Sequence, residues 1–298
     1  MSANLSTHNS SQPFVLFAQH GWADIPKDIT NLARALSREN TLIYAPDLGI
    51  IDTWLMIEPL ITKVEQVARS VLLKHPDLPW RIVGHSMGGL IWLELLHRHP
   101  EWLPQVHSLV VVGSPVGGSD LGRLYDPLRL FPLIARDLGT NRRLIAEAVA
   151  AQVPTLSIVG DIGNHTDGTV PVGCSQFTHA SMVYLDGIRH ATLKNHPRVA
   201  AAIRQFWANP TIAPMANDLA SQLIAKLRSQ DLTETHNQNF KKAKLLKTYP
   251  EGIKLWTWTN PLQIVHVFIS VDERCVYSAY TGWQDRAKFA IALQDLLK

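Results

Sequence analysis

A short apolar strand that runs directly into a Gly-x-Ser-x-Gly pattern is the feature that most constrains the fold of this chain. Arg81-Ile82-Val83 is followed at once by Gly84-His85-Ser86-Met87-Gly88-Gly89, and a helix-forming run then continues to His99-Pro100. Glycines on both sides of a serine let a strand end and a helix start approach without Cβ clashes, and this sharp turn holds the serine hydroxyl clear of the backbone. The pattern therefore predicts that Ser86 is a nucleophile at the end of a buried strand.

In this strand-to-helix context, Gly84-His85-Ser86-Met87-Gly88-Gly89 resembles the nucleophile motif of the α/β-hydrolase superfamily, and within it the lipase and esterase branch. The resemblance covers about residues 13–208. It implies an α/β fold, the α/β-hydrolase fold, with a mainly parallel sheet and helices on both faces. It also implies a serine hydrolase chemistry that needs no cofactor and no metal, and no phosphate-binding glycine loop or spaced metal ligands stand out in the sequence.

Short apolar runs alternate with helical patterns through this region. Strands are predicted at 14–18, 42–45, 81–83, 108–112, 155–159 and 181–185. Helices are predicted at 25–39, 59–75, 87–99, 141–150 and 196–208. Such alternation is typical of a parallel sheet covered on both faces, whose functional loops lie at the carboxyl ends of the strands.

Residues 114–140 interrupt the alternation. Ser114-Pro115-Val116-Gly117-Gly118-Ser119 leaves a predicted strand, and an apolar segment broken by Pro127 and Pro132 follows. Because α/β-hydrolases commonly insert a cap at this point, the resemblance implies a short cap at 114–140. An ordinary connecting helix packed on the core is the alternative.

The chain beyond residue 208 shows no family resemblance. Asn209-Pro210-Thr211-Ile212-Ala213-Pro214 is interpreted as a linker, because its prolines stop the preceding helix. We expect residues 215–298 to form a small α+β domain beside the hydrolase core and to contribute nothing to its catalytic residues. The predicted elements are helices near 217–229 and 239–246, strands at 254–259, 263–271 and 275–280 in an antiparallel meander, and a helix at 283–297.

A serine hydroxyl needs a base to remove its proton, and that base needs a third group to fix its tautomer. In the superfamily these groups follow the chain order nucleophile, acid, histidine. His190 follows the last predicted strand and matches the family's catalytic histidine in position. The rival histidines are His165, His179 and His196.

Two aspartates compete for the role of the acid. Asp167 begins Asp167-Gly168-Thr169-Val170-Pro171, which is similar to the acid-bearing segment of many bacterial lipases. Asp161 ends the preceding strand and would otherwise brace the same loop, a common role for aspartate at a strand exit. The predicted catalytic residues are therefore Ser86, Asp167 and His190, with Asp161 as the alternative acid.

The tetrahedral intermediate of acyl transfer carries an oxyanion that needs hydrogen-bond donors. One predicted donor is the backbone N–H of Met87, where the start of the following helix also favours negative charge. The second is implied by the resemblance, because His20-Gly21-Trp22 matches the family's His-Gly motif, whose next residue supplies an N–H. The oxyanion hole is therefore predicted at Trp22 and Met87, with His20 as a structural loop residue.

Composition restricts the partners that we expect. The net charge of +3 lies entirely in residues 211–298, which carry eleven Lys or Arg and eight Asp or Glu. Nucleic-acid-binding domains are usually far more basic, so no nucleic-acid partner is expected, and Lys241, Lys242, Lys244 and Lys247 are interpreted as a solvated helix face. No signal-peptide pattern and no apolar run of about 20 residues is present, and two cysteines imply no disulfide framework. We expect a cytoplasmic protein without a transmembrane segment, and the sequence indicates no particular oligomeric state.

These residues together predict a serine carboxylic-ester hydrolase, lipase- or esterase-like, that acts through an acyl-serine on a hydrophobic or acyl ester. The partner would be a small-molecule ester or a lipid. An acyltransferase with the same triad is an alternative, because both reactions share one acyl-enzyme. A non-catalytic binding protein with a hydrolase fold is the second alternative, since fold alone does not determine function.

Overall fold

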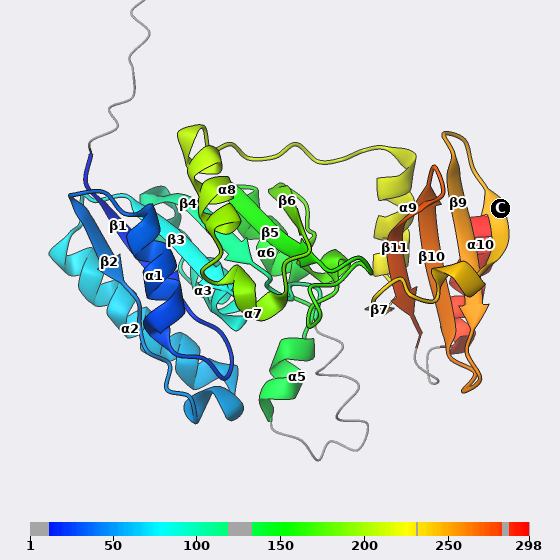
Figure 1. Ribbon diagram of the computed structural model, residues 1–298, viewed down its shortest axis with the longest axis horizontal. Coiled ribbons are helices and arrows are strands. Elements are labelled where there is room, and N and C mark those ends of the chain that lie inside the picture. The colour runs from blue at the N-terminus through cyan, green and yellow to red at the C-terminus, as the bar shows by residue number, and fades with distance from the viewer. Residues whose placement is uncertain (1–11, 119–132, 231, 282–285, 298) are drawn as a thin grey trace, which may run out of the picture.

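The computed structural model describes residues 12–118, 133–230, 232–281 and 286–297. These residues form a six-stranded sheet with the order β2-β1-β3-β4-β5-β6 and a five-stranded sheet with the order β7-β11-β10-β9-β8. The first sheet belongs to the region that resembles α/β-hydrolases. Figure 1 shows the second sheet on the side of β5 and β6, away from β2.

All strand pairs of the first sheet are parallel. The α/β fold predicted from the sequence is confirmed, and each of the six predicted strands is present. The strands span Phe14–Gln19 (β1), Thr41–Tyr44 (β2), Trp80–His85 (β3), Val106–Val112 (β4), Thr155–Asp161 (β5) and Ala180–Asp186 (β6).

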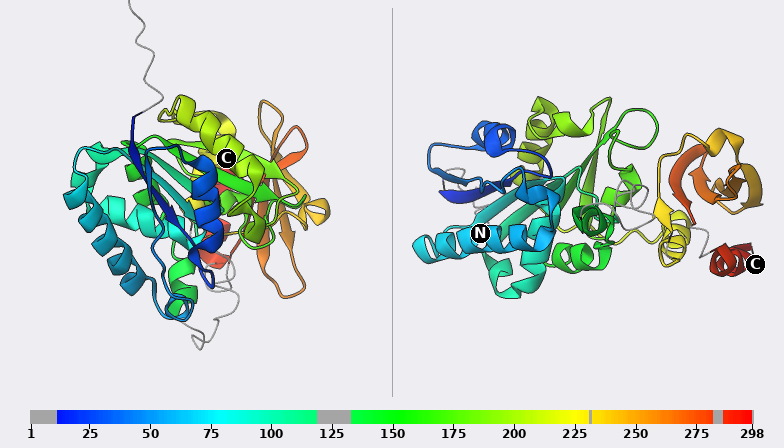
Figure 2. Two further views of the ribbon diagram at one scale, coloured as in Figure 1. Left: turned by 60° about the vertical axis from the view of Figure 1, so that its left-hand side comes forward. Right: turned by 90° about the horizontal axis from the view of Figure 1, so that it is seen from below.

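Helices cover both faces of this sheet, as Figure 2 shows. Along β1, Leu16 and Ala18 belong to the cluster that includes α1 and α8, whereas Val15 and Phe17 belong to the cluster that includes α2 and α3. Successive side chains of a strand point to opposite faces, so a strand buried on both faces is apolar throughout. The helices span Pro26–Leu36 (α1), Ile57–Lys74 (α2), Met87–Arg98 (α3), Leu133–Gly139 (α5), Arg143–Ala150 (α6), His190–Leu193 (α7) and Pro197–Ala208 (α8). Short 3-10 helices lie at Asp52–Trp54 (η1), Pro100–Gln105 (η2) and Val172–Ser175 (η3).

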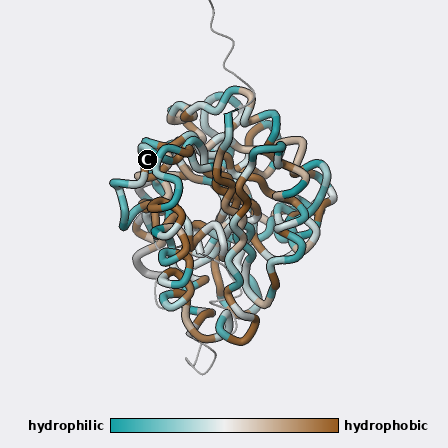
Figure 3. The backbone as a smooth tube through the Cα atoms, turned by 90° about the vertical axis from the view of Figure 1, so that its left-hand side faces the viewer, coloured by the Kyte–Doolittle hydropathy of each residue, from teal (hydrophilic) through white to brown (hydrophobic). Residues whose placement is uncertain are grey.

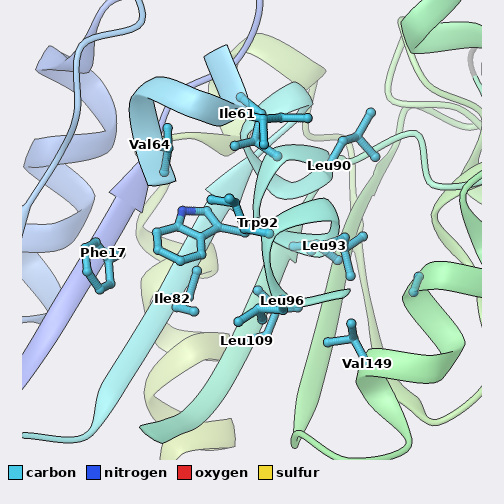
Figure 4. Close-up of a cluster of buried hydrophobic side chains, with 14 of the residues drawn as sticks. Phe17, Ile61, Val64, Ile82, Leu90, Trp92, Leu93, Leu96, Leu109 and Val149 are labelled. Atoms are coloured by element: carbon cyan, nitrogen blue, oxygen red, sulfur yellow. The ribbon is translucent and has the colours of Figure 1, made fainter. Parts of the chain in front are cut away.

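Large aromatic side chains hold α3 against the sheet. The ring centroid of Phe17 lies 4.7 Å from that of Trp92 in α3 and 5.0 Å from that of Trp80 in β3. Figure 4 shows Trp92 surrounded by aliphatic side chains, and Figure 3 shows the central strands as hydrophobic segments inside a more polar surround. Burying a side chain of this kind stabilises the fold by roughly 1.5–3 kcal/mol. The start of α3, which carries the site, is therefore fixed by the core.

The second sheet is an antiparallel meander with one added strand at each edge. Its central strands β9, β10 and β11 are the three predicted strands, and their antiparallel pairing is confirmed. Leu223 and Leu227 of α9 and Phe289 of α10 pack with strand residues in one apolar cluster. The elements span Leu219–Arg228 (α9), Thr233–Glu234 (β7), Phe240–Lys242 (η4), Lys244–Thr248 (β8), Ile253–Thr259 (β9), Val265–Val271 (β10), Arg274–Tyr280 (β11) and Arg286–Leu297 (α10).

The prediction of a second basic helix at 239–246 is wrong. The segment forms the single turn η4 and then strand β8, in which Leu245 pairs with Trp256 of β9. Helix propensity is a weak preference that tertiary context overrides. Here the outer edge of β9 supplies hydrogen-bond partners that no local pattern of the segment reveals.

The predicted cap at 114–140 falls largely on residues 119–132, which lie outside the described residues. Helix α5 follows this gap, and the side chain of its Asp137 accepts the backbone N–H of Ile57 at 2.9 Å, which ties α5 to the start of α2. Within the residues that the structure describes, no helix is long and apolar enough to cross a membrane.

Candidate active site

Ser86 lies at a strained turn between β3 and α3. Its φ is 53° and its ψ is −124°, a conformation that non-glycine residues rarely adopt. Its backbone N–H donates to the carbonyl of Val112 at 2.8 Å, and this bond fixes the turn to the end of β4. The residue is partly exposed, whereas Met87, Gly88 and the rest of the first helical turn are buried. The turn therefore presents the Ser86 hydroxyl at the carboxyl edge of the sheet.

The structure brings Ser86, His190 and Asp167 into one hydrogen-bonded series. The Ser86 hydroxyl lies 3.1 Å from Nε2 of His190, and Nδ1 of His190 lies 2.6 Å from Oδ2 of Asp167. Because a carboxylate only accepts, Nδ1 carries the proton and Nε2 is left to accept the serine hydroxyl. The His190 backbone N–H also donates to the Asp167 carbonyl at 2.9 Å. This is the geometry of a base that is oriented by an acid and aligned on a hydroxyl.

Asp167 lies in residues 162–176, here called the acid loop, which follow β5. Its Oδ1 accepts the backbone N–H groups of Thr169 and Val170 at 2.9 and 2.7 Å, and the side chain is 2% exposed. Three bonds therefore hold the carboxylate, two from its own loop and one from His190. A buried carboxylate is tolerated when it is hydrogen-bonded in this way.

Asp161 has a different position. Its Oδ1 accepts the backbone N–H groups of Gly163, Asn164 and His165 at 2.8, 3.1 and 3.0 Å. When an aspartate accepts hydrogen bonds from the N–H groups of the residues that follow it, these bonds shape a turn at the exit of a strand. The structure therefore places Asp161 at the root of the acid loop and Asp167 against His190.

The rival histidines are engaged elsewhere. His179 lies with Nδ1 3.2 Å from the carbonyl of Ala213, in the linker. His196 caps α8, and its Nδ1 accepts the backbone N–H of Arg198 at 3.1 Å. His165 adopts a positive φ of 61°, and its backbone N–H donates to Asp161. Within the part of the chain that the structure describes, none of these three histidines makes a hydrogen bond to the Ser86 hydroxyl.

The loop after β1 lies directly on the turn at Ser86. A Cβ added at Gly21 would lie 2.9 Å from Cβ of Ser86 and 3.4 Å from the backbone N of Met87, so only glycine allows this approach. Trp22 follows Gly21, and its side chain is 38% exposed. The predicted donors Trp22 and Met87 are therefore carried by two segments in contact beside Ser86. Met87 is the first residue of α3, where an N–H has no partner within the helix.

His20 holds this loop in place. Its Nε2 accepts the backbone N–H of Leu48 at 3.0 Å, so Nδ1 carries the proton and donates to the carbonyl of Gly21 at 3.1 Å. Burial lowers the pKa of the His20 imidazole, which favours this neutral form. Both ring nitrogens are occupied, so His20 acts as a structural residue of the loop.

His85 is a residue of the site that sequence reasoning treated as the variable position of the motif. Its ring lies 4.8 Å from the His190 ring, centroid to centroid, and its Nε2 donates to the backbone carbonyl of His190 at 3.1 Å. Burial lowers the pKa of His85 well below the ordinary value, and the neighbouring His190 lowers it further. A neutral His85 therefore supports His190 from the strand side. The motif itself carries no signal of this contact, because His190 lies 105 residues away.

The described residues include no cluster of three or more His, Cys, Asp or Glu side chains that could hold a metal ion.

Comparison with known proteins supports the fold. A family profile described as serine aminopeptidase, S33 matches residues 12–209. The mature form of the Bacillus licheniformis lipase BlEst2 is similar in structure, with a TM-score of 0.53 and 14% identity over 68% of this chain and 94% of the lipase. The metagenomic carboxyl esterase MGS0156 gives a TM-score of 0.52 and 16% identity over 67% of this chain and 76% of the esterase.

Phospholipase PlaB from Legionella pneumophila gives a TM-score of 0.51 and 13% identity over 80% of this chain and 67% of that chain. At these identities the likeness establishes the fold. No curated protein matches the sequence. The family match spans the first sheet and the helices that cover it, so the predicted relationship to α/β-hydrolases is confirmed. The chain belongs to the serine aminopeptidase S33 family of α/β-hydrolases.

Proposed function

We propose that this hydrolase is a serine carboxylic-ester hydrolase that acts through an acyl-serine intermediate. The observation that carries the proposal is the hydrogen-bonded series from Ser86 through His190 to Asp167, with distances of 3.1 and 2.6 Å. A protein that only binds a ligand has no chemical need for a base aligned on a strained serine. The catalytic roles of Ser86, His190 and Asp167 are therefore preferred to a binding function.

In the acylation step, the Ser86 oxygen attacks the ester carbonyl carbon while Nε2 of His190 takes the hydroxyl proton. The carbonyl oxygen becomes an oxyanion, which accepts the N–H groups of Trp22 and Met87. Removing one such donor lowers the rate by about 10²–10³ in related chemistry. The bond to the alkoxy oxygen then breaks, and the alcohol leaves with the proton that Nε2 returns.

Deacylation follows the same route in reverse. A water molecule gives a proton to Nε2 of His190 as its oxygen attacks the acyl carbon, and the bond to the Ser86 oxygen breaks. Ser86 regains the proton and the carboxylic acid is released. An alcohol or thiol in place of water would give acyl transfer from the same intermediate.

The surface beside Trp22 favours an apolar substrate. Trp22 and Trp54 contact each other at 4.4 Å between ring centroids and are 38% and 42% exposed. The backbone N–H of Ala23 donates to the Thr53 hydroxyl at 3.1 Å, which ties the loop after β1 to η1. The other exposed apolar side chains of these two segments are Ile25, Ile50, Ile51, Leu55 and Met56. Large exposed apolar patches mark ligand-binding grooves and sites of contact with proteins or membranes, so this surface is suited to an apolar substrate.

The two carboxylates that follow the loop of Trp22 are paired and therefore do not offer a free site for the amino terminus of a peptide substrate. An aminopeptidase has to bind the positive amino terminus of its substrate, for which a free carboxylate is suited. Asp24 and Asp28, which follow the loop of Trp22, both bind the ammonium of Lys194, at 2.8 and 3.1 Å. The names of the similar structures, a lipase and a carboxyl esterase, agree with an ester as the substrate.

The test is reaction of the full chain with a fluorophosphonate, peptide mapping of the adduct, and turnover of p-nitrophenyl butyrate. We expect an adduct on Ser86 and loss of both reactions in Ser86→Ala. Ser37→Ala is the control, because the Ser37 hydroxyl caps the end of α1 by donating to Arg34. A folded wild-type chain without an adduct would overturn the proposal. Faster turnover of an aminoacyl p-nitroanilide than of the ester would overturn the ester specificity.

A further inference from the structure

The carboxyl-terminal sheet holds one buried carboxylate against the hydrolase core. Glu234 ends β7, the edge strand that Figure 1 shows beside the core, and its side chain is 4% exposed. A buried charge destabilises the fold unless it is paired and hydrogen-bonded. The partners of Glu234 therefore show what this edge of the sheet is built to contact.

Two arginines from different parts of the chain bind Glu234. Nη2 of Arg143, in α6 of the core, lies 2.6 Å from Oε1, and Nε of Arg228, at the end of α9, donates to the same oxygen at 2.9 Å. Burial alone would raise the pKa of the Glu234 carboxyl, but the two guanidinium groups outweigh burial and hold that pKa below its ordinary value. The charged carboxylate thus joins the carboxyl-terminal unit to the core.

Both arginines also donate to the acid loop. Nη2 of Arg143 and Nη2 of Arg228 lie 2.7 and 3.2 Å from the carbonyl oxygen of Gly173, and Nε of Arg143 lies 2.9 Å from that of Gln176. A Cβ added at Gly173 would overlap the Glu234 carboxylate, so a larger residue there would displace this carboxylate from its present position.

A second contact reaches the other end of the same loop. The backbone N–H of Asn237, which follows β7, donates to the carbonyl of Asn164 at 3.1 Å. Residues of the carboxyl-terminal unit therefore contact the acid loop on both sides of Asp167. The loop does not rest on the first sheet alone.

The residues of the acid loop that contact the carboxyl-terminal unit are connected to Asp167 by backbone hydrogen bonds within the loop. The N–H of Val172 donates to the carbonyl of His165 at 2.9 Å, and the N–H of Asp167 donates to that of Val170 at 3.2 Å. Turn η3, which contains Gly173, continues directly from this closed segment. A shift of Gly173 is therefore transmitted to the carboxylate that has to stay 2.6 Å from His190.

On the basis of the proposed serine hydrolase function, we propose that the carboxyl-terminal unit positions the catalytic acid, with Glu234 as a positioning residue that acts through Asp167. Without the Glu234 charge, the buried Arg143 and the partly buried Arg228 would face each other across the Gly173 carbonyl as two unpaired cations. Like charges in such a site repel and are costly to desolvate. The loop would then move to separate them. Residues 215–298 thus gain a role in the site, in contrast to the expectation drawn from the sequence.

The test is a double-mutant cycle in the full-length protein with p-nitrophenyl butyrate as the substrate. We expect Glu234→Gln to lower kcat about 10-fold or more and to change KM less than about 2-fold, because small displacements of catalytic groups lower rates by up to about 10². In an Asp167→Asn background, Glu234→Gln should change kcat less than about 2-fold, because residues that act as a unit are not additive.

Two controls separate positioning from general destabilisation. Glu273→Gln removes an exposed carboxylate that pairs with Lys254 in the same sheet and should leave kcat unchanged. Val267→Ala loosens the buried core of that sheet without touching the acid loop and should lower the unfolding temperature but not kcat. If Glu234→Gln does not fold, Arg228→Met carries the same cycle, because it removes a donor to the Gly173 carbonyl of the acid loop while Glu234 stays paired with Arg143.

Loss of kcat that disappears in the Asp167→Asn background would support the inference. Wild-type kcat in both Glu234→Gln and Arg228→Met would overturn it, and so would equal losses in the two backgrounds, because a structural defect is additive. The activity of the wild type tests the proposed function separately from the role of Glu234. A wild-type chain that neither hydrolyses the ester nor reacts with a fluorophosphonate would overturn the proposed function and this inference with it, whereas an active wild type with unaffected variants overturns the inference alone.

Discussion

Replacing Asp167 by asparagine should damage the reaction far more than the same change at Asp161. The asparagine oxygen at position 167 can still accept the N–H groups of Thr169 and Val170, which now donate to Oδ1 at 2.9 and 2.7 Å. Its NH₂ group then faces Nδ1 of His190, where an acceptor lay at 2.6 Å. A donor at this place forces Nδ1 to accept and moves the imidazole proton to Nε2, so the base can no longer take the proton of Ser86.

The magnitude follows from this change of tautomer. In an established Ser-His-Asp triad the same substitution lowers kcat about 10⁴-fold, which corresponds to about 5 kcal/mol in the activation free energy. Asp161→Asn keeps the oxygen that accepts from Gly163, Asn164 and His165 and loses only its charge. Hydrogen bonds to a charged acceptor exceed neutral ones by about 1 kcal/mol each. None of the three bonds involves His190, so their weakening affects the turn rather than the tautomer, and we expect less than about a 10-fold loss in kcat there.

The assay is kcat for p-nitrophenyl butyrate hydrolysis by both variants, with thermal unfolding to show that each is folded. A loss in Asp161→Asn that equals or exceeds the loss in Asp167→Asn would refute the assignment of the acid. Equal unfolding temperatures with the expected difference in kcat would exclude a general effect on stability.

Two further predictions concern histidines outside the triad. His85→Phe keeps a ring beside His190 but removes the donor to the His190 carbonyl. Loss of one hydrogen bond of about 1–1.5 kcal/mol should lower kcat about 10-fold, and His85→Gln should lower it less. Equal kcat in His85→Phe and wild type would contradict this role of His85. His266 is buried in the second sheet, and burial, with a smaller effect of His236, lowers its pKa to about 4. The folded state therefore favours neutral His266, and its contribution to stability is complete above pH 6.5 and is lost as pH falls toward 4. Unfolding temperatures at pH 7 and pH 5 should differ less for His266→Phe than for wild type, and an unchanged difference would show that another group is responsible.

The sequence by itself determined the first sheet and the strand-to-helix turn at Ser86. The six strands were predictable because a parallel strand buried on both faces is a short apolar run between turn residues, as at Thr155–Asp161. The turn at Ser86 was predictable because its φ of 53° and its close packing require small neighbouring residues, and these neighbours are adjacent in the sequence. Both features depend on interactions within a few positions along the chain.

The tertiary structure decided what depends on residues far apart in the chain. Asp161 and Asp167 are both suited to the acid by type and position, and only the folded loop shows that Asp167 lies against His190 while Asp161 shapes the turn. Lys244–Thr248 became a strand because β9 offered an open edge, which the lysines and leucines of the segment do not indicate. In the sequence nothing distinguishes Glu234 from the other acidic residues. Only the folded chain brings its two partners, Arg143 and Arg228, to the same carboxylate from 91 and 6 residues earlier. A sequence pattern reports local conformation and burial, whereas a hydrogen bond between distant segments exists only once the chain has folded.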